Sequence, residues 1–123
     1  MRFVVLEKAK QGPPWIGVDF DGTLAEHPKG EFKKKDLKPI APMVSRVKRW
    51  MKDGKDVHIL TARVSPESFS KKKVKKQRKV IRKWCKKHLG RKLPVTSEKN
   101  QALSAIYDNI AYHVVKDKGH VVR

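Results

Sequence analysis

The chain has 123 residues and a mass of 14.2 kDa, which suits one domain with a modest core and is too short for two. Its 31 basic and 12 acidic residues give a formal net charge of +19. No uncharged run approaches the roughly 18 residues of a membrane span, the apolar start is too short for a signal peptide, and one cysteine excludes a disulfide framework. We therefore expect a single soluble, cytoplasmic domain over residues 1–123.

Short apolar runs in the first half of the chain predict strands followed by a helix. Residues 3–6 are β-like, and residues 15–18 form a buried strand that leads directly into the hexad Asp-Phe-Asp-Gly-Thr-Leu at 19–24. Residues 27–42 are polar and contain several prolines, so we expect an exposed loop or flap there. An amphipathic helix is predicted over residues 43–53, and Gly54 ends it.

The second half continues the alternation of strands and helices. A strand is predicted over 56–60 and a lysine-rich helix over 69–89; residues 94–96 enter a short segment, and further strands are predicted at 105–107 and 111–115. The helix has an apolar stripe that consists of Val74, Ile81, Trp84, Cys85 and Leu89. Trp84 and Cys85 read as core residues, and His58 as a residue packed within its strand. This alternation predicts an α/β fold, namely a single Rossmann-like three-layer domain with a mostly parallel sheet.

Polar side chains follow three of the predicted strands. They are Asp19, Asp21, Thr61 and Asp108. Parallel sheets bind ligands beyond the carboxyl ends of their strands. We expect the carboxylates of Asp19 and Asp21 to lie side by side, where they would repel unless a cation lay between them, and oxygen ligands favour Mg²⁺. An Asp- and Gly-rich turn also arises for purely local reasons.

The hexad at 19–24, placed directly after an apolar strand, resembles the first signature of the haloacid dehalogenase superfamily, whose members are mostly magnesium-dependent phosphohydrolases. Three further signatures of that superfamily are matched in the required order by Thr61, by Lys99 and by the pair Asp108-Asn109. The segments at 39–43, 61–63 and 93–96 are similar to those of small capless members found in bacteriophage genomes, which suggests the cytoplasm of an infected host cell. Many of those members carry Asp-Asp where this chain has Asp-Asn.

The resemblance implies a role for each matched position. Asp19 would attack the phosphorus to form an aspartyl-phosphate, and Asp21 would serve as general acid and base. The implied Mg²⁺ ligands are Asp19, Asp21 through its backbone carbonyl, and Asp108 or Asn109. The implied phosphate-binding residues are Gly22, Thr23, Thr61, Ala62 and Lys99. The resemblance also implies a domain without a cap.

The lysine-rich helix over 69–89 has two interpretations. A run of charge is usually a solvated face. Alternatively, the helix contacts the phosphates of a nucleic acid, and the candidate residues are Lys72, Lys76, Lys79 and Lys83. With an open site and a charge of +19, the second interpretation favours a terminal phosphate of a nucleic acid as the substrate. Two alternatives stay open: the same chemistry on a nucleotide, small phosphoester or phosphoprotein, and a catalytically weak, basic nucleic-acid-binding protein on the same fold.

Overall fold

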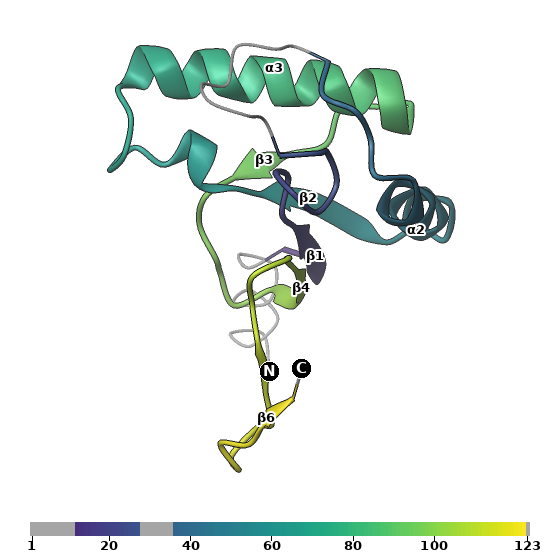
Figure 1. Cartoon of the computed structure of the whole chain (residues 1–123), viewed down its shortest axis with the longest axis vertical. Helices are drawn as coiled ribbons and strands as arrows, with labels where there is room; N and C mark the ends of the chain where they lie inside the picture. Colours follow the sequence, from purple (N-terminus) through teal and green to yellow (C-terminus); the bar gives the residue numbers. More distant parts are fainter. Residues whose placement is uncertain (1–11, 28–35, 123) are drawn as a thin grey trace, which may run out of the picture.

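A four-stranded parallel sheet forms the centre of the fold (Figure 1). The computed structural model describes residues 12–27 and 36–122, so the strand predicted at 3–6 lies outside the described residues. The strands are β1 (Trp15–Val18), β2 (Asp56–Leu60), β3 (Val95–Thr96) and β4 (Leu103–Tyr107), in the spatial order β3-β2-β1-β4. All pairings in this sheet are parallel. The predicted α/β class and parallel sheet are confirmed.

Helices α2 (Ala41–Lys52) and α3 (Lys71–Leu89) pack on the same face of the sheet. Val47 of α2 and Ile81 of α3 share one hydrophobic core with Val57 and Ile59 of β2. The strand order gives the reason, because β1–α2–β2 and β2–α3–β3 step in the same direction, and right-handed crossovers then cover the same face. The return from β3 to β4 is a short loop without a helix. The described residues therefore form two layers, and the predicted third layer is not seen among them.

Both helices end where glycine takes a left-handed conformation, and a side chain caps the start of α3. Gly54 follows α2 with φ +78°, and Gly90 follows α3 with φ +92°. The Oγ of Ser70 accepts a hydrogen bond from the backbone N–H of Lys73 at 3.2 Å, so α3 begins at Lys71 rather than at residue 69. α2 begins at Ala41, two residues earlier than predicted, because Pro42 suits the first turn of a helix.

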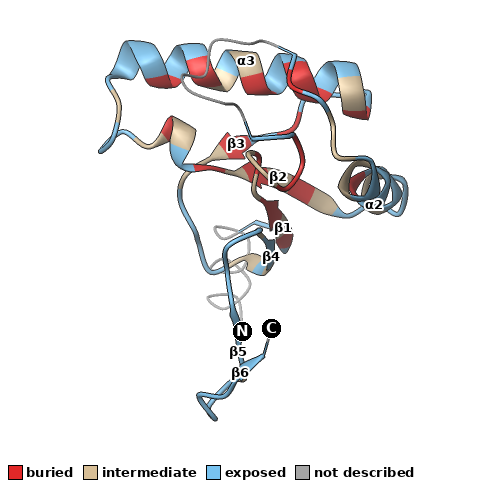
Figure 2. Cartoon of the chain, viewed as in Figure 1, coloured by how far each residue is buried: buried red, intermediate tan, exposed pale blue. Residues whose placement is uncertain are grey.

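The apolar stripe of α3 lies against the sheet as predicted, and Figure 2 shows the buried residues along this helix and in the strands. Trp84 is 2% exposed, meets the ring of Phe20 edge-on at 5.1 Å, and donates its indole N–H to the carbonyl of Leu37 at 2.7 Å. Burial raises the pKa of the Cys85 thiol to about 12. His58 stacks on Trp15 at 4.6 Å. The predicted core roles of Trp84 and Cys85 are confirmed, and His58 is packed against Trp15 as predicted.

The predicted loop over 27–42 is only partly exposed. Leu37 is buried in the core, where it receives the Trp84 bond, and Pro39 bridges Ala25 in antiparallel fashion. Asp36 accepts hydrogen bonds from Lys87 and His88 of α3, and the bond from Lys87 is the main reason that the pKa of Asp36 is lowered. Residues 28–35 lie outside the described part of the chain. The described end of this segment is therefore anchored on α3.

The C-terminal strand departs from the prediction. β5 (His113–Val114) is shorter than the predicted strand at 111–115 and does not join the main sheet. It pairs antiparallel with β6 (Val121–Val122), and both strands of this hairpin are exposed (Figure 2). The turn at Asp117 and Gly119, both with positive φ, reverses the chain, so that β6 lies beside β5 and pairs with it. Across residues 12–27 and 36–122, no helix has the length and apolar character needed to cross a membrane.

Candidate active site

The carboxyl ends of β2, β1 and β4 bring the predicted polar residues to one edge of the sheet. The backbone N–H of Asp19, directly after β1, donates to the carbonyl of Tyr107 at the end of β4 at 2.9 Å. The backbone N–H of Thr61, directly after β2, donates to the carbonyl of Thr96 at 2.8 Å. Asp108 follows β4 and acts electrostatically on Asp19. The prediction that these strand-end residues meet at one edge is confirmed.

A tight turn follows β1 and separates the two acidic residues of the hexad. The carbonyl of Phe20 accepts the backbone N–H groups of Leu24 and Ala25, both at 3.0 Å, while the Phe20 ring is buried against Trp84. Gly22 has φ +80°, and its N–H donates to the carbonyl of Ala25 at 2.8 Å. The turn is therefore closed by its own backbone, and the Gly22 amide predicted to bind phosphate is already paired within it.

The carboxylate of Asp19 lies in an environment that disfavours negative charge. Burial raises its pKa, the Asp108 carboxylate adds to this, and Asp21 contributes less, so that the pKa of Asp19 rises to about 6. The Oγ1 of Thr23 is 3.4 Å from Asp19 Oδ2 and 3.4 Å from Asn109 Oδ1. A hydroxyl has one proton, so Thr23 bonds one of these oxygens at a time. Asp19, Thr23 and Asn109 thus form one polar group beside Asp108.

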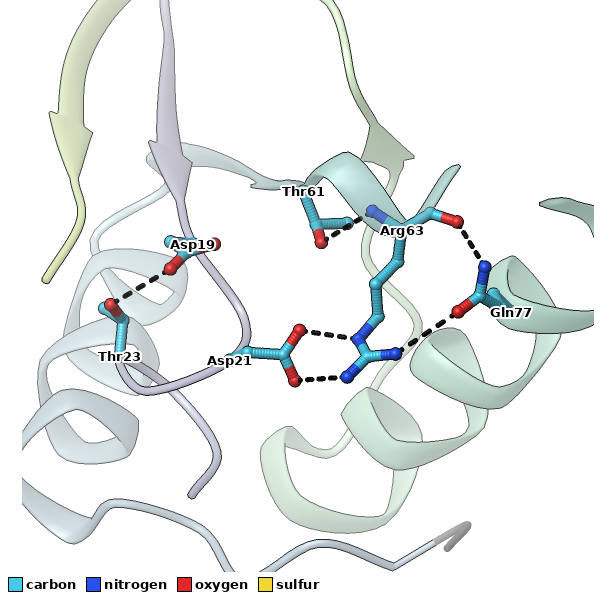
Figure 3. Close-up of polar contacts among 6 residues, drawn as sticks. All are labelled: Asp19, Asp21, Thr23, Thr61, Arg63 and Gln77. Atoms are coloured by element: carbon cyan, nitrogen blue, oxygen red, sulfur yellow. Dashed lines mark hydrogen bonds and ion pairs between the residues drawn. The ribbon is translucent and has the colours of Figure 1, made fainter. Parts of the chain in front are cut away.

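The carboxylate of Asp21 does not lie beside that of Asp19, contrary to the prediction. It turns toward Arg63, whose Nε and Nη2 donate to Asp21 Oδ2 at 2.5 Å and to Oδ1 at 3.0 Å (Figure 3). Attraction to this guanidinium removes the need for a cation between two neighbouring carboxylates. Arg63 and its partner Gln77 were not among the predicted site residues. The Thr61-Ala62-Arg63 segment placed Arg63 near the edge, but nothing in the sequence links Gln77 to it.

The oxygen atoms around Asp19 suit a magnesium ion. Asp19 and Asp108 offer carboxylates, and Asn109 offers an amide oxygen within the same polar group. No three His, Cys, Asp or Glu side chains gather into a metal-binding group within the described ranges. Mg²⁺ is usually held by one or two carboxylates together with water and substrate phosphate, so two carboxylates are enough. Burial is the main cause of the raised Asp19 pKa and the Asp108 carboxylate the next, and such an ion would offset the repulsion between these two carboxylates.

Comparisons with known proteins leave the chain without a match. No protein-family model matches it, and neither a curated protein nor a solved structure does so. Evidence for function therefore comes from the residues at this edge of the sheet.

The structure brings only part of the predicted set of phosphate ligands to the site. Thr61 is buried, and its Oγ1 accepts the backbone N–H of Arg63 at 3.2 Å. Ala62 is exposed and begins the 3-10 helix η1 (Ala62–Val64). Lys99 is exposed and lines, together with Asp108, a pocket of about 530 Å³ along β4. The structure thus brings Thr61 to the edge that carries Asp19 but leaves Lys99 next to Asn100, which bonds Trp15 and Leu103 at the amino ends of β1 and β4.

The four lysines proposed to contact nucleic acid are exposed on α3. They are Lys72, Lys76, Lys79 and Lys83. Their spacing of four, three and four residues places them on one face of the helix. The buried residues of α3, which include Val74, Gln77 and Ile81, occupy the side toward the sheet. The four lysines therefore project to solvent beside the site rather than into it.

Gly22→Ala should destabilise the protein more than Gly54→Ala. Both glycines have φ near +80°, so alanine at either position is expected to cost about 1 kcal/mol through backbone strain. A Cβ at Gly22 would also lie 3.0 Å from Asn109 Nδ2, whereas a Cβ at Gly54 has no atom within 4 Å. Urea denaturation of both variants checks this expectation. Adding Asn109→Ala to Gly22→Ala should remove the extra loss, and equal losses for the two glycines would contradict it.

Proposed function

We propose that the chain is a magnesium-dependent phosphohydrolase that works through an aspartyl-phosphate on Asp19. The observation that carries the proposal is the arrangement at the carboxyl edge of the sheet. There, Asp19 lies beside Asp108 in a charge-disfavouring environment, and Asp21 is turned away from it toward Arg63. A nucleophile and an acid placed apart leave room for a phosphoryl group between them, as an in-line displacement requires. The four matched signatures lead to the same chemistry.

The proposed reaction has two steps. In the first step, an oxygen of Asp19 attacks the phosphorus while the bond to the leaving oxygen breaks, and Asp21 gives its proton to that oxygen. In the second step, Asp21 takes a proton from water as the water attacks the phosphorus, which releases phosphate and restores Asp19. Thr61 would bind the phosphoryl oxygens, and Lys99 would have to reach them from the loop before β4 to take the role that the resemblance implies. When bound by Asp19, Asp108, Asn109 and the Asp21 carbonyl, Mg²⁺ supplies positive charge that offsets the charge of the transferring group.

The terminal phosphate of a nucleic acid is the substrate that the charge distribution supports best. The chain carries a net charge of +19, and the exposed lysines of α3 lie on the same helix as Gln77, which contacts the site. Only residues 22–40 separate Asp21 from α2, so the first crossover leaves little room for a cap domain. A site of this kind would admit the end of a polyanion, and lysines would hold its phosphates without reading bases.

Phosphate release from three substrates tests the proposal. They are a 3′-phosphorylated oligonucleotide, a 5′-phosphorylated oligonucleotide and an aryl phosphate, each assayed with Mg²⁺ and with a chelator. We expect Mg²⁺-dependent release that is fastest on an oligonucleotide, falls as salt rises, and is absent in Asp19→Asn. No release from any substrate, with oligonucleotides still bound at moderate salt, would overturn the enzyme proposal in favour of a nucleic-acid-binding protein. Equal rates of phosphate release from all three substrates, unchanged by salt, would indicate that the natural substrate is a small phosphoester.

Two sets of lysine substitutions separate the role of α3 from that of overall charge. The first replaces the four lysines of α3 by glutamine. The matched control replaces four exposed lysines elsewhere, namely Lys48, Lys52, Lys55 and Lys116. If α3 contacts the substrate, the first set should weaken oligonucleotide turnover and flatten its salt dependence more than the control, with the aryl phosphate unaffected. Equal effects of the two sets would contradict a specific role for α3.

A further inference from the structure

Arg63 links the acidic turn after β1 to the segment after β2. Its guanidinium binds both oxygens of Asp21 in a bidentate ion pair, and both side chains are only 16% exposed. A paired guanidinium and carboxylate in this planar geometry is among the stronger and more directional contacts between side chains. The position of the Asp21 carboxylate is therefore set by Arg63 rather than by the turn alone.

Gln77 of α3 contacts both the guanidinium and the backbone carbonyl of Arg63. The Oε1 of Gln77 accepts from Arg63 Nη1 at 3.2 Å, and the Nε2 of Gln77 donates to the backbone carbonyl of Arg63 at 2.6 Å (Figure 3). Gln77 is 5% exposed on the sheet-facing side of α3, which is an unusual place for a polar side chain. Thr61 Oγ1 accepts the Arg63 N–H as well. These contacts leave Arg63 little freedom, so Asp21 is held by a fixed partner.

We infer that Arg63 is a positioning residue for the leaving-group step, with Gln77 as its support. The inference rests on the proposed phosphohydrolase function. An in-line displacement places the attacking and leaving oxygens on opposite sides of the phosphorus. The residue that protonates the leaving oxygen must then lie on the far side of the phosphoryl group from Asp19, and the ion pair turns Asp21 away from Asp19. For the transfer, Asp21 Oδ1 gives up its longer bond to Arg63 Nη2 and carries the proton, while Oδ2 keeps accepting from Arg63 Nε.

The dependence of turnover on the leaving group tests this role. An alkyl phosphate needs protonation of its leaving oxygen, whereas a nitrophenyl phosphate needs little. Asp21→Asn should lower kcat on the alkyl substrate by about a hundredfold or more, and far less on the nitrophenyl substrate. Arg63→Gln should show the same dependence on the leaving group, with about a tenfold or larger loss on the alkyl substrate only. The double variant should lose no more than Asp21→Asn alone.

Further variants keep the test decisive if Arg63→Gln folds poorly. Gln77→Leu removes both hydrogen bonds from Gln77 to Arg63 and keeps Arg63 itself. Arg63→Lys keeps the positive charge but cannot bind both oxygens of Asp21 at once. Both variants should lower kcat on the alkyl phosphate and leave kcat on the nitrophenyl phosphate unchanged. Arg78→Gln is the matched control, because Arg78 also lies on α3 but donates to the carbonyl of Val95. Equal losses on both substrates, or a rise in KM alone, would overturn the positioning role. If wild-type protein releases no phosphate from any substrate, the proposed function fails and this role fails with it.

A measurement without substrate examines the ion pair itself. The free energy of unfolding of wild type, Asp21→Asn, Arg63→Gln and the double variant forms a double-mutant cycle. A favourable coupling between Asp21 and Arg63 is expected whether or not the chain is an enzyme. Its absence would overturn the positioning role even if the phosphohydrolase function stands.

Discussion

Asp19→Asn is expected to abolish phosphate release and yet to stabilise the metal-free protein. At about pH 7.5 the free energy of unfolding should rise by about 1–2 kcal/mol. The reason is that Asp19 is ionised in an environment that favours its neutral form, with burial and the Asp108 carboxylate raising its pKa to about 6. Asparagine keeps a similar shape without the charge. The range allows for the partial exposure of the carboxylate. Urea denaturation in the presence of a chelator measures the difference.

The stabilisation by Asp19→Asn should depend on pH in a defined direction. The unfolded chain has an Asp19 pKa near 3.8 and the folded protein one near 6, so folding favours the protonated form. Below the lower value Asp19 is protonated in both states, and the variant gains nothing. As pH rises through the interval between these values, the wild type loses stability relative to the variant. The difference should therefore be small near pH 4 and complete above pH 7.

Magnesium should reverse the order of stability. Binding to the folded wild type adds RT ln(1 + [Mg²⁺]/Kd), which is about 1–3 kcal/mol when the ion is present at about ten to a hundred times its Kd. Asp19→Asn should gain much less because it lacks a ligand. Asp53→Asn, at the end of α2, serves as a control that should change neither the pH dependence nor the Mg²⁺ effect. A variant less stable than wild type without metal would show that the Asp19 charge is not destabilising, and an equal Mg²⁺ shift in both proteins would show that Asp19 is not a ligand.

Trp84→Ala is expected to cause the largest loss of stability, about 4 kcal/mol. Trp84 is 2% exposed, supports the ring of Phe20 between the two acidic residues, and donates to the carbonyl of Leu37. Alanine leaves a cavity beneath the turn at 19–24 and leaves the backbone carbonyl of Leu37 without its hydrogen bond. A domain of this size has only a modest free energy of unfolding, so the variant should be partly unfolded at 37 °C. Urea denaturation and thermal melting give the loss.

Trp84→Phe separates the packing contribution of the indole from the contribution of its hydrogen bond. Phenylalanine fills most of the space and cannot donate to Leu37, so we expect a loss of about 1–2 kcal/mol. Val80→Ala, on the same helix and only partly buried, is the control and should cost less than Trp84→Ala. If Trp84→Ala cost no more than Val80→Ala, the support of Phe20 by Trp84 would be contradicted.

The sequence predicted the parts of the fold that depend on local periodicity and chain order. The apolar stripe of α3 and the glycines that end α2 and α3 lie where the pattern placed them. The predicted third layer is not seen in residues 12–27 and 36–122, because the placement of helices depends on the strand order β3-β2-β1-β4, which local patterns do not contain. The strand predicted at 111–115 is present only as β5, and it lies outside the main sheet because a short exposed run pairs with the segment that its turn brings beside it.

For the site, the sequence by itself determined which residues end the strands. Asp19, Thr61 and Asp108 follow β1, β2 and β4 directly, and parallel strands with right-handed crossovers bring such ends to one edge. Only the tertiary structure decided the partner of Asp21, which is Arg63, 42 residues away and held in turn by Gln77. The physical reason is that an alternation of strands and helices specifies where the backbone ends each strand. The direction of a charged side chain depends instead on which opposite charge the packed elements bring within hydrogen-bond distance.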